Sequence, residues 1–389
     1  MPGAFPVRPP IGASETASSY ASRLARANGF DTLWGLCGFV GMRLKDLGNG
    51  STASLSRLAR ISTVDEDRLR RATIRRNRNG RLSVGREMVS HDNVRTSTIA
   101  FCPACVRDDR ATESPIMASE RAWQRLEWRF EPITVCGTHD MELVVVRVPL
   151  RHTNGDFVSA LEWCDSAGLL PADGRPAVFS PRQAYLAGRL RGETVFAGAF
   201  VDGLAWYAAA RMFECVGTAD LAPGLIRFRK NEVLDDPATT ADRGFDILSG
   251  GREAFAAWIA DRIDRSRTEE ACPAWPASRT IFGDLADTLE RIPDPAYDPV
   301  RAMLVEAATE RLPLAPGSTY LGIAIPETRL HSLRSASNEA ELPVERMAEI
   351  LRDADLLPAD ADALTPERVL MPAAPVDDLD VSGNWSFWR

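Results

Sequence analysis

Two short motifs decide how the middle of this 389-residue chain folds: Cys102-Pro103-Ala104-Cys105 and, after thirty intervening residues, Cys136-Gly137-Thr138-His139. A two-residue spacer lets both ends of a tight turn point at one ion, and two such turns supply the four ligands of a tetrahedral zinc centre. A CxxC pair alone also serves redox chemistry, but a redox site does not need a CxxH downstream. The pattern therefore predicts one Zn²⁺, bound by Cys102, Cys105, Cys136 and His139.

Four protein ligands leave no coordination position for water, so the predicted site is structural rather than catalytic. Asp108 and Asp109 follow the first motif, and paired carboxylates can act in catalysis or bind a metal, but no further acid or histidine stands at a supporting spacing. Apolar side chains between the motifs are expected to pack around the ion: Trp123, Leu126, Trp128 and Phe130. The remaining cysteines are isolated and are expected to be small core or surface residues: Cys37, Cys164, Cys215 and Cys272.

A helical pattern precedes the two motifs. Leu55, Leu58 and Ala59 share one face of a short helix, and after a break Thr63 and Glu66 have the spacing of a capping box that would begin a second helix. Two short helices joined by a tight turn are the outline of a helix-turn-helix. The same pattern fits any helical hairpin, so the pattern alone leaves both structures open.

An arginine cluster follows the second of these helices. Seven arginines occur within fourteen residues, and no acidic residue stands between Asp67 and Glu87: Arg68, Arg70, Arg71, Arg75, Arg76, Arg78 and Arg81. A solvated helix face is the alternative, but such faces normally mix both signs of charge. The cluster is typical of a surface that lies along DNA phosphates.

The charge of the chain is divided unevenly along its length. The whole chain has a net charge of -8, but residues 1–150 carry 22 basic and 16 acidic residues, and the remainder carries 24 and 38. Such asymmetry suggests that the N-terminal part meets a polyanion and the rest does not. A genome rich in G and C would also favour arginine, so composition alone does not decide the matter.

The sequence predicts a mainly α protein with a small zinc-ribbon-like module. We expect an N-terminal helical, helix-turn-helix-like part, the zinc module, a helical domain, a second helix-turn-helix and a tail, at residues 1–86, 87–150, 151–330, 331–371 and 372–389. The second helix pair falls between Leu333 and Leu357, and three arginines there could contact phosphate, although six acidic residues weaken the case: Arg334, Arg346 and Arg352. DNA contact, protein contact and plain packing all stay open for this pair. In the tail, Trp385, Phe387 and Trp388 could dock.

Several of these motifs, in order, resemble the TniQ family. The metal region carries the core of the resemblance: Phe101–Asp109, Trp123, Leu126–Phe130, Ile133–His139 and Leu143. The N-terminal helices are similar as well: Glu15, Ser18–Phe30 with its helix stop at Asn28-Gly29, and Leu58–Leu69. Many members carry a further CxxC, which residues 144–152 lack, so a second zinc site is not expected. The resemblance covers about residues 5–145, and residues 150–389 match only loosely.

The resemblance implies a non-enzymatic accessory protein of DNA transposition. Relatives bind DNA or, in CRISPR-associated elements, a guide-RNA effector complex, and help to recruit the transposition ATPase and the transposase. By the same resemblance Cys102, Cys105, Cys136 and His139 are the zinc ligands. Whether the chain forms a homodimer, and which DNA sequence it reads, stay open.

Two other classes of function compete with this one. A zinc-containing DNA-binding transcriptional regulator unconnected with a transposon would use the same basic helix and zinc site. An enzyme is not indicated, because the chain has no GxSxG, GxxxxGK[ST], HExxH or nucleotide-binding fingerprint. We also expect no membrane association and a cytoplasmic location, because the sequence shows no apolar run of membrane-spanning length and no signal peptide.

Overall fold

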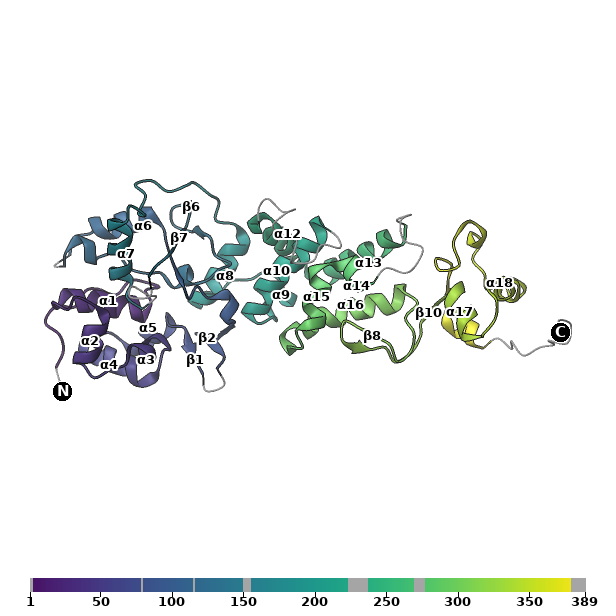
Figure 1. Cartoon of the computed structure of the whole chain (residues 1–389), viewed down its shortest axis with the longest axis horizontal. Coiled ribbons are helices and arrows are strands. Elements are labelled where there is room, and N and C mark those ends of the chain that lie inside the picture. The colour runs from purple at the N-terminus through teal and green to yellow at the C-terminus, as the bar shows by residue number, and fades with distance from the viewer. Residues whose placement is uncertain are drawn as a thin grey trace. The chain divides into compact units, whose positions relative to one another are not determined.

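The computed structural model describes residues 3–77, 80–114, 116–149, 155–222, 237–268 and 277–378. The described chain is mainly helical, with short antiparallel strand pairs, as the sequence predicts (Figure 1). It divides into two compact units, residues 1–197 with 205–210 and residues 198–204 with 211–389. The finer division into five segments stays a prediction. Among the described helices, none combines the length and the apolar character that crossing a bilayer would require.

The first unit begins with five helices around one buried cluster: α1 Ala17–Ala27, α2 Leu33–Phe39, α3 Leu44–Gly48, α4 Thr52–Ser62 and α5 Glu66–Arg71. Thr16 caps α1 by accepting a hydrogen bond from the Ser19 amide. The helix ends at the predicted stop, because Asn28 is its last cap and Gly29 adopts a φ of +80° that favours glycine. Tyr20 and Leu24, on the inner face of α1, are fully buried.

The connection between α4 and α5 differs from the predicted capping box. Thr63 has a φ of 59° and is the C-terminal cap of α4, and Asp65 caps α5 by accepting a hydrogen bond from the Asp67 amide at 3.3 Å. An N-cap needs an extended backbone, which a residue in the left-handed conformation cannot offer. The tight turn between the helices requires the left-handed residue, so the prediction that Thr63 begins the second helix was wrong.

Short strands connect the helices to the region of the four candidate metal ligands. In one sheet β2 Leu82–Val84 pairs with both β1 Arg75–Arg76 and β3 Glu87–Val89. The metal region is closed by β4 Thr98–Phe101 paired with β7 Val144–Arg147, and it contains β5 Val135–Cys136 paired with β6 Met141–Glu142. Between them lie α6 Pro103–Ala111 and the 3-10 helix η3 Leu126–Arg129. Because β4 and β7 flank the region in sequence, their pairing brings its two ends together.

The first unit is completed by α7 Phe157–Ser166, α8 Pro181–Arg191 and the first residues of α10 Trp206–Leu221. Asp156, at the start of α7, accepts hydrogen bonds from the Ser22 hydroxyl at 2.6 Å and the Leu33 amide at 2.8 Å. This one carboxylate therefore joins α7 to both α1 and α2.

The second unit is built from helices, with the bounds α9 Ala199–Asp202, α12 Pro237–Ser249, α13 Gly251–Thr268, α14 Ser278–Phe282, α15 Asp284–Arg291 and α16 Asp298–Arg311, together with the later part of α10. Two glycines allow α10 and α12 to touch through their backbones. A Cβ at Gly217 would lie 1.8 Å from the Thr240 carbonyl oxygen, and one at Gly244 would lie 1.8 Å from that of Phe213. Neither position accepts a side chain.

The second unit ends with a small subdomain around the predicted second helix pair. The pair is present as α17 Leu333–Glu339 and α18 Val344–Asp353, preceded by the hairpin of β8 Thr319–Tyr320 and β9 Ile323–Ala324. β10 Leu330–Ser332 pairs with β11 Leu370–Pro372, and α19 Ala373–Asp377 follows, within the stretch that the sequence assigned to the tail. The three tail aromatics lie outside the described residues.

Candidate metal centre and arginine cluster

The first motif stands where β4 passes into α6. Cys102 is the N-cap of this helix, with an extended backbone, and Pro103 occupies its first turn. Proline suits that position because its fixed φ fits a helix and its missing amide hydrogen would have had no partner there. Cys105 then lies in the same first turn, so both sulfurs stand at a helix N-terminus, where the backbone amides favour the thiolate form.

The second motif forms the turn between β5 and β6. The Asp140 amide donates to the Cys136 carbonyl at 3.0 Å, and Asp140 itself has a φ of 47°. Position 137 has no room for a side chain, because a Cβ there would lie 2.7 Å from Cε1 of Phe179. The turn is thereby held with Cys136 and His139 on the side of the first motif.

The four predicted ligands lie together. Their ligand atoms are all within 4.8 Å of one another. Sγ of Cys105 is 3.6 Å from Sγ of Cys136 and 3.2 Å from Nδ1 of His139, and Nδ1 is 3.6 Å from Sγ of Cys102. Ligands of a tetrahedral zinc ion, at about 2.3 Å for sulfur and about 2.0 Å for nitrogen, lie roughly 3.5–3.8 Å apart. The group could therefore bind one metal ion, and its geometry is compatible with zinc.

The three cysteine thiols shift one another's pKa values. Hydrogen bonds from Cys102 and Cys105 lower the pKa of Cys136 far below its usual range. Hydrogen bonding to Cys102 and Cys136, together with burial, raises the pKa of Cys105. The three thiols therefore perturb one another, and a divalent cation bound between them would favour the thiolate form of all three.

Asp108 orients the histidine, a role that the sequence analysis did not find. Its Oδ2 lies 2.8 Å from Nε2 of His139. A proton on Nε2 is donated to this carboxylate, which leaves the lone pair of Nδ1 directed at the sulfurs, as in carboxylate–histidine–metal arrangements. The signal in the sequence was an acid three residues after Cys105, where a helix places it on the same face as that ligand.

The neighbouring Asp109 acts differently. It forms a two-pronged ion pair with Arg125, at 2.6 and 2.9 Å, and this pair raises the pKa of Arg125 although burial opposes it. The Arg125 guanidinium lies 3.9 Å from the ring centre of Trp123 and 4.7 Å from that of Trp128. Trp128 packs in the same buried cluster as the cysteine ligands. Two of the aromatic residues expected near the ion are therefore fixed by one arginine.

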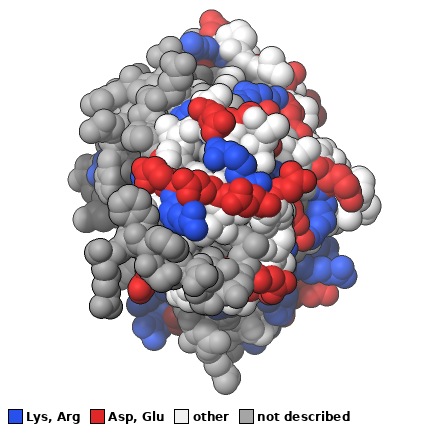
Figure 2. All heavy atoms as spheres, turned by 90° about the vertical axis from the view of Figure 1, so that its right-hand side faces the viewer, with Lys and Arg blue, Asp and Glu red and all other residues white. Residues whose placement is uncertain are grey.

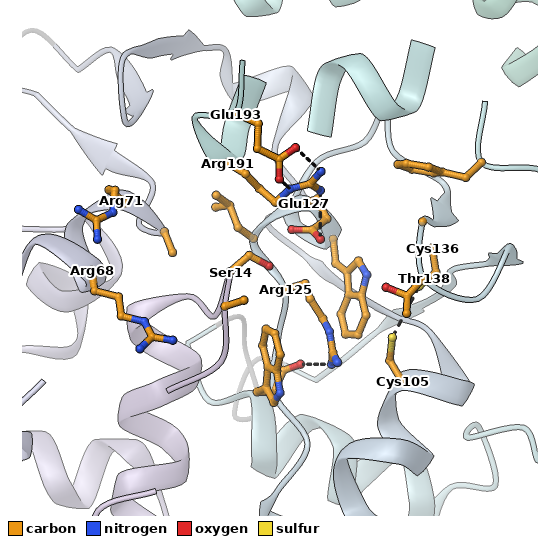
Figure 3. Close-up of a pocket in the computed structure, with 17 residues that line it drawn as sticks. Ser14, Arg68, Arg71, Cys105, Arg125, Glu127, Cys136, Thr138, Arg191 and Glu193 are labelled. Carbon is orange, nitrogen blue, oxygen red and sulfur yellow. Dashed lines mark hydrogen bonds and ion pairs between the residues drawn. The ribbon is translucent and has the colours of Figure 1, made fainter. Parts of the chain in front are cut away.

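A cleft of about 610 Å³ opens beside the metal group (Figure 3). Arg68 and Arg71 of α5 stand on one side of it, and the opposite side includes Cys105 and Cys136 (Figure 3). The charged residues farther along the lining include both signs: Arg125, Glu127, Arg191 and Glu193. The cleft therefore joins the arginine cluster to the metal-binding region.

The structure separates the six described arginines of the cluster into two groups. Arg70 is paired with Glu66 of its own helix, and Arg68 and Arg75 each donate a hydrogen bond to a backbone carbonyl, at 2.8 and 3.2 Å. Within the described part of the chain, three others are exposed with no side-chain hydrogen bond or ion pair: Arg71, Arg76 and Arg81. Arg78 lies outside the described residues.

The isolated cysteines within the described residues are all buried. Burial raises the pKa of Cys37 and Cys164 to about 11 and that of Cys215 to about 12. A thiol with so high a pKa is a poor nucleophile, which agrees with the expected packing role. Cys272 lies outside the described residues.

Fold and site together define a helical domain closed by a group of three cysteines and one histidine that could bind one metal ion. Residues 6–143 match the model of the TniQ family. This part of the chain is a TniQ domain, and the resemblance seen in the sequence is confirmed. The domain is consistent with an accessory protein associated with transposition. No curated protein matches the chain.

Proposed function

We propose that this protein is a non-enzymatic accessory protein of DNA transposition. In this proposal its TniQ domain carries one structural Zn²⁺, contacts DNA, and helps to recruit the transposition ATPase and the transposase. The observation that carries the proposal is the ligand group of three cysteines and one histidine inside the matched residues. TniQ proteins are generally non-catalytic, and that general property supports the non-enzymatic part.

Cys102, Cys105, Cys136 and His139 would hold the ion. Three thiolates and an imidazole are a donor set that selects zinc over harder cations. A bound Zn²⁺ would supply a cross-link between the start of α6 and the β5–β6 turn. Asp108 would hold the His139 ring in the ligating orientation, and Trp128 would exclude water from the cysteine side.

The DNA contact is assigned to a helix-turn-helix-like arrangement, α4 and α5 followed by the β1–β2 hairpin. Arg76 and Arg81 flank the tip of this hairpin, and Arg71 lies on the preceding helix. Because these side chains have no partner among the described residues, they can reach phosphates without breaking internal bonds. Arg68, Arg70 and Arg75 would contribute less, since each already makes a bond within the protein.

A first experiment tests the metal and the DNA contact together. We expect elemental analysis of the purified full-length protein to find one zinc per chain. Fluorescence anisotropy with a labelled DNA duplex should show binding that weakens steeply with salt. A protein without stoichiometric zinc, or without salt-dependent DNA binding, would contradict the corresponding part of the proposal.

A second experiment tests recruitment. The protein should co-purify with the AAA+ ATPase and the transposase encoded beside its gene, or with a guide-RNA effector complex if one is encoded there. Size-exclusion chromatography with light scattering would show whether it acts as a homodimer. The TniQ match does not favour the alternative of a transcriptional regulator, and an ATPase that fails to bind under all conditions would revive it.

A further inference from the structure

A buried histidine in the C-terminal subdomain faces two carboxylates. His331 of β10 is only 2 % exposed, and its Nε2 lies 2.8 Å from Oδ1 of Asp377 and 3.8 Å from Oε2 of Glu339. The three ligand atoms lie within 4.8 Å of one another. They come from β10, from α17, which directly follows it, and from α19, which the fold brings back from about forty residues further along the chain.

Negative charge is concentrated around the His331 side chain. Glu339 is the last residue of α17 and Asp377 the last of α19, and the free carbonyl groups at a helix C-terminus already concentrate negative charge. Among the described residues, neither carboxylate has a lysine or arginine within ion-pair distance. The nearby Arg334 is paired with Glu367 instead. Acidic side chains also form a band across this end of the second unit (Figure 2).

The hydrogen bonds of Ser335 indicate where the imidazole carries its proton. The Ser335 Oγ accepts from the Ser332 amide at 2.8 Å and donates to the Ser332 carbonyl at 3.1 Å. Its remaining lone pair faces Nδ1 of His331 at 3.3 Å, so Nδ1 is the nitrogen that donates. With Nδ1 as the donor, the lone pair of Nε2 is available to a cation placed between it and the two carboxylates.

We propose that Nε2 of His331 and the carboxylates of Asp377 and Glu339 bind one divalent cation of the Mn²⁺ or Zn²⁺ class. Ligands at about 2.0–2.2 Å from a common ion lie roughly 3–4 Å apart. The 3.8 Å separation of Nε2 from Glu339 falls in this range, and the 2.8 Å separation from Asp377 needs only a small outward movement of an exposed carboxylate. One imidazole and two carboxylates suit these ions, and the remaining coordination positions are open to water. The ion cross-links α19 to β10 and α17, in a subdomain with only a small core of its own.

The test uses the full-length protein with zinc at the cysteine group and Mn²⁺ as the probe. Mn²⁺ competes poorly for thiolates, so it leaves that group unchanged. Electron paramagnetic resonance of the free aqueous ion should show one saturable Mn²⁺ per chain. Asp377→Asn and Glu339→Gln should each weaken binding about tenfold or more. Asp378→Asn, which changes an exposed neighbour, should leave it unchanged.

The exposed carboxylates are the main variants because their substitution does not disturb the core, and circular dichroism should confirm that they stay folded. His331→Gln should abolish binding. Absence of saturable Mn²⁺ binding, or equal affinity in Asp377→Asn and Asp378→Asn, would overturn the proposal. The three side chains would then be held together by their direct contacts alone. The zinc content of the cysteine group, measured in the same samples, keeps this outcome separate from the proposed function.

Discussion

The two helix pairs of the molecule, α4–α5 in the first unit and α17–α18 in the second, share an outline but differ in charge. On and after α5 three arginines have no partner among the described residues: Arg71, Arg76 and Arg81. In the second pair each arginine is neutralised, Arg334 by Glu367, Arg346 by Glu349 and Arg352 by Asp362, at 2.8–3.1 Å. The comparison teaches that two short helices and a turn can carry very different surface charge, and we propose DNA contact only for the pair with unpaired arginines.

Removal of a metal ligand should have the largest effect on the first unit and none on the second helix pair. Cys105→Ser should release the ion and unfold the metal region, because structural zinc contributes on the order of 10 kcal/mol to folding. DNA binding should be lost, while hydrogen exchange in α17–α18 should stay as slow as before. Elemental analysis and exchange mass spectrometry check both outcomes. Cys164→Ala, which changes a buried cysteine outside the ligand group, should keep the zinc, and a Cys105→Ser protein with full zinc would refute the assignment.

Gly137→Ala tests how tightly the second motif is packed. A new Cβ at 2.7 Å from the Phe179 ring must displace that ring or the turn, so we expect the free energy of unfolding to fall by about 1–3 kcal/mol. Chemical denaturation measures the loss. The double variant with Phe179→Ala should suffer less from the added methyl group than the single one, and an additive effect would show that the contact is unimportant.

Asp108→Asn separates the roles of the two adjacent acids. Loss of the carboxylate that orients His139 should lower zinc affinity by roughly 10- to 100-fold, as measured by competition with a chromophoric chelator. Asp109→Asn breaks the pair with Arg125 instead, so it should reduce stability with little change in zinc affinity. Equal zinc affinities in the two variants would argue against the orienting role.

The smallest effect is expected at the exposed arginines. Replacing Arg76 and Arg81 by glutamine should lower the salt dependence of DNA binding by about two phosphate contacts, with a modest loss of affinity. Arg346→Gln with Arg352→Gln is the matched control in the other helix pair and should leave the slope unchanged. If the two double variants behave alike in an anisotropy assay, the proposed difference between the pairs does not exist.

Local patterns in the sequence were sufficient for some of these features and not for others. The spacing of Cys102, Cys105, Cys136 and His139 predicted that the four side chains lie together, because each motif forms a local turn and each supplies only half of a metal-ligand set. Asn28-Gly29 correctly marked the end of α1. Thr63 was misassigned because the turn, rather than the capping pattern, determines its backbone conformation. Long-range contacts were beyond reach of such patterns.

The orienting carboxylate and the arginine cluster illustrate that limit. Asp108 lies on α6 and His139 in the turn between β5 and β6, 31 residues further along the chain. Its spacing from Cys105 puts Asp108 on the ligand side of α6, but that spacing does not show which side chain it meets there. In the same way, a run of arginines in the sequence does not show which guanidinium groups form hydrogen bonds within the protein and which remain exposed. Arg68 and Arg75 reach backbone carbonyls that are contributed by other segments.

Trp206 has a consequence for how the molecule can be divided. The chain passes between the two units three times, and Trp206 returns to the first unit, where its ring centre lies 5.1 Å from that of Phe130 and its Nε1 donates to the Leu186 carbonyl at 3.0 Å. The family match ends at residue 143, well before this tryptophan. An expression fragment that ends at Ala197 would lack Trp206, and Phe130 would lose the aromatic ring that packs against it. A fragment that extends to Ala210 keeps Trp206 and its contacts, so we expect it to be more stable than one that ends at Ala197.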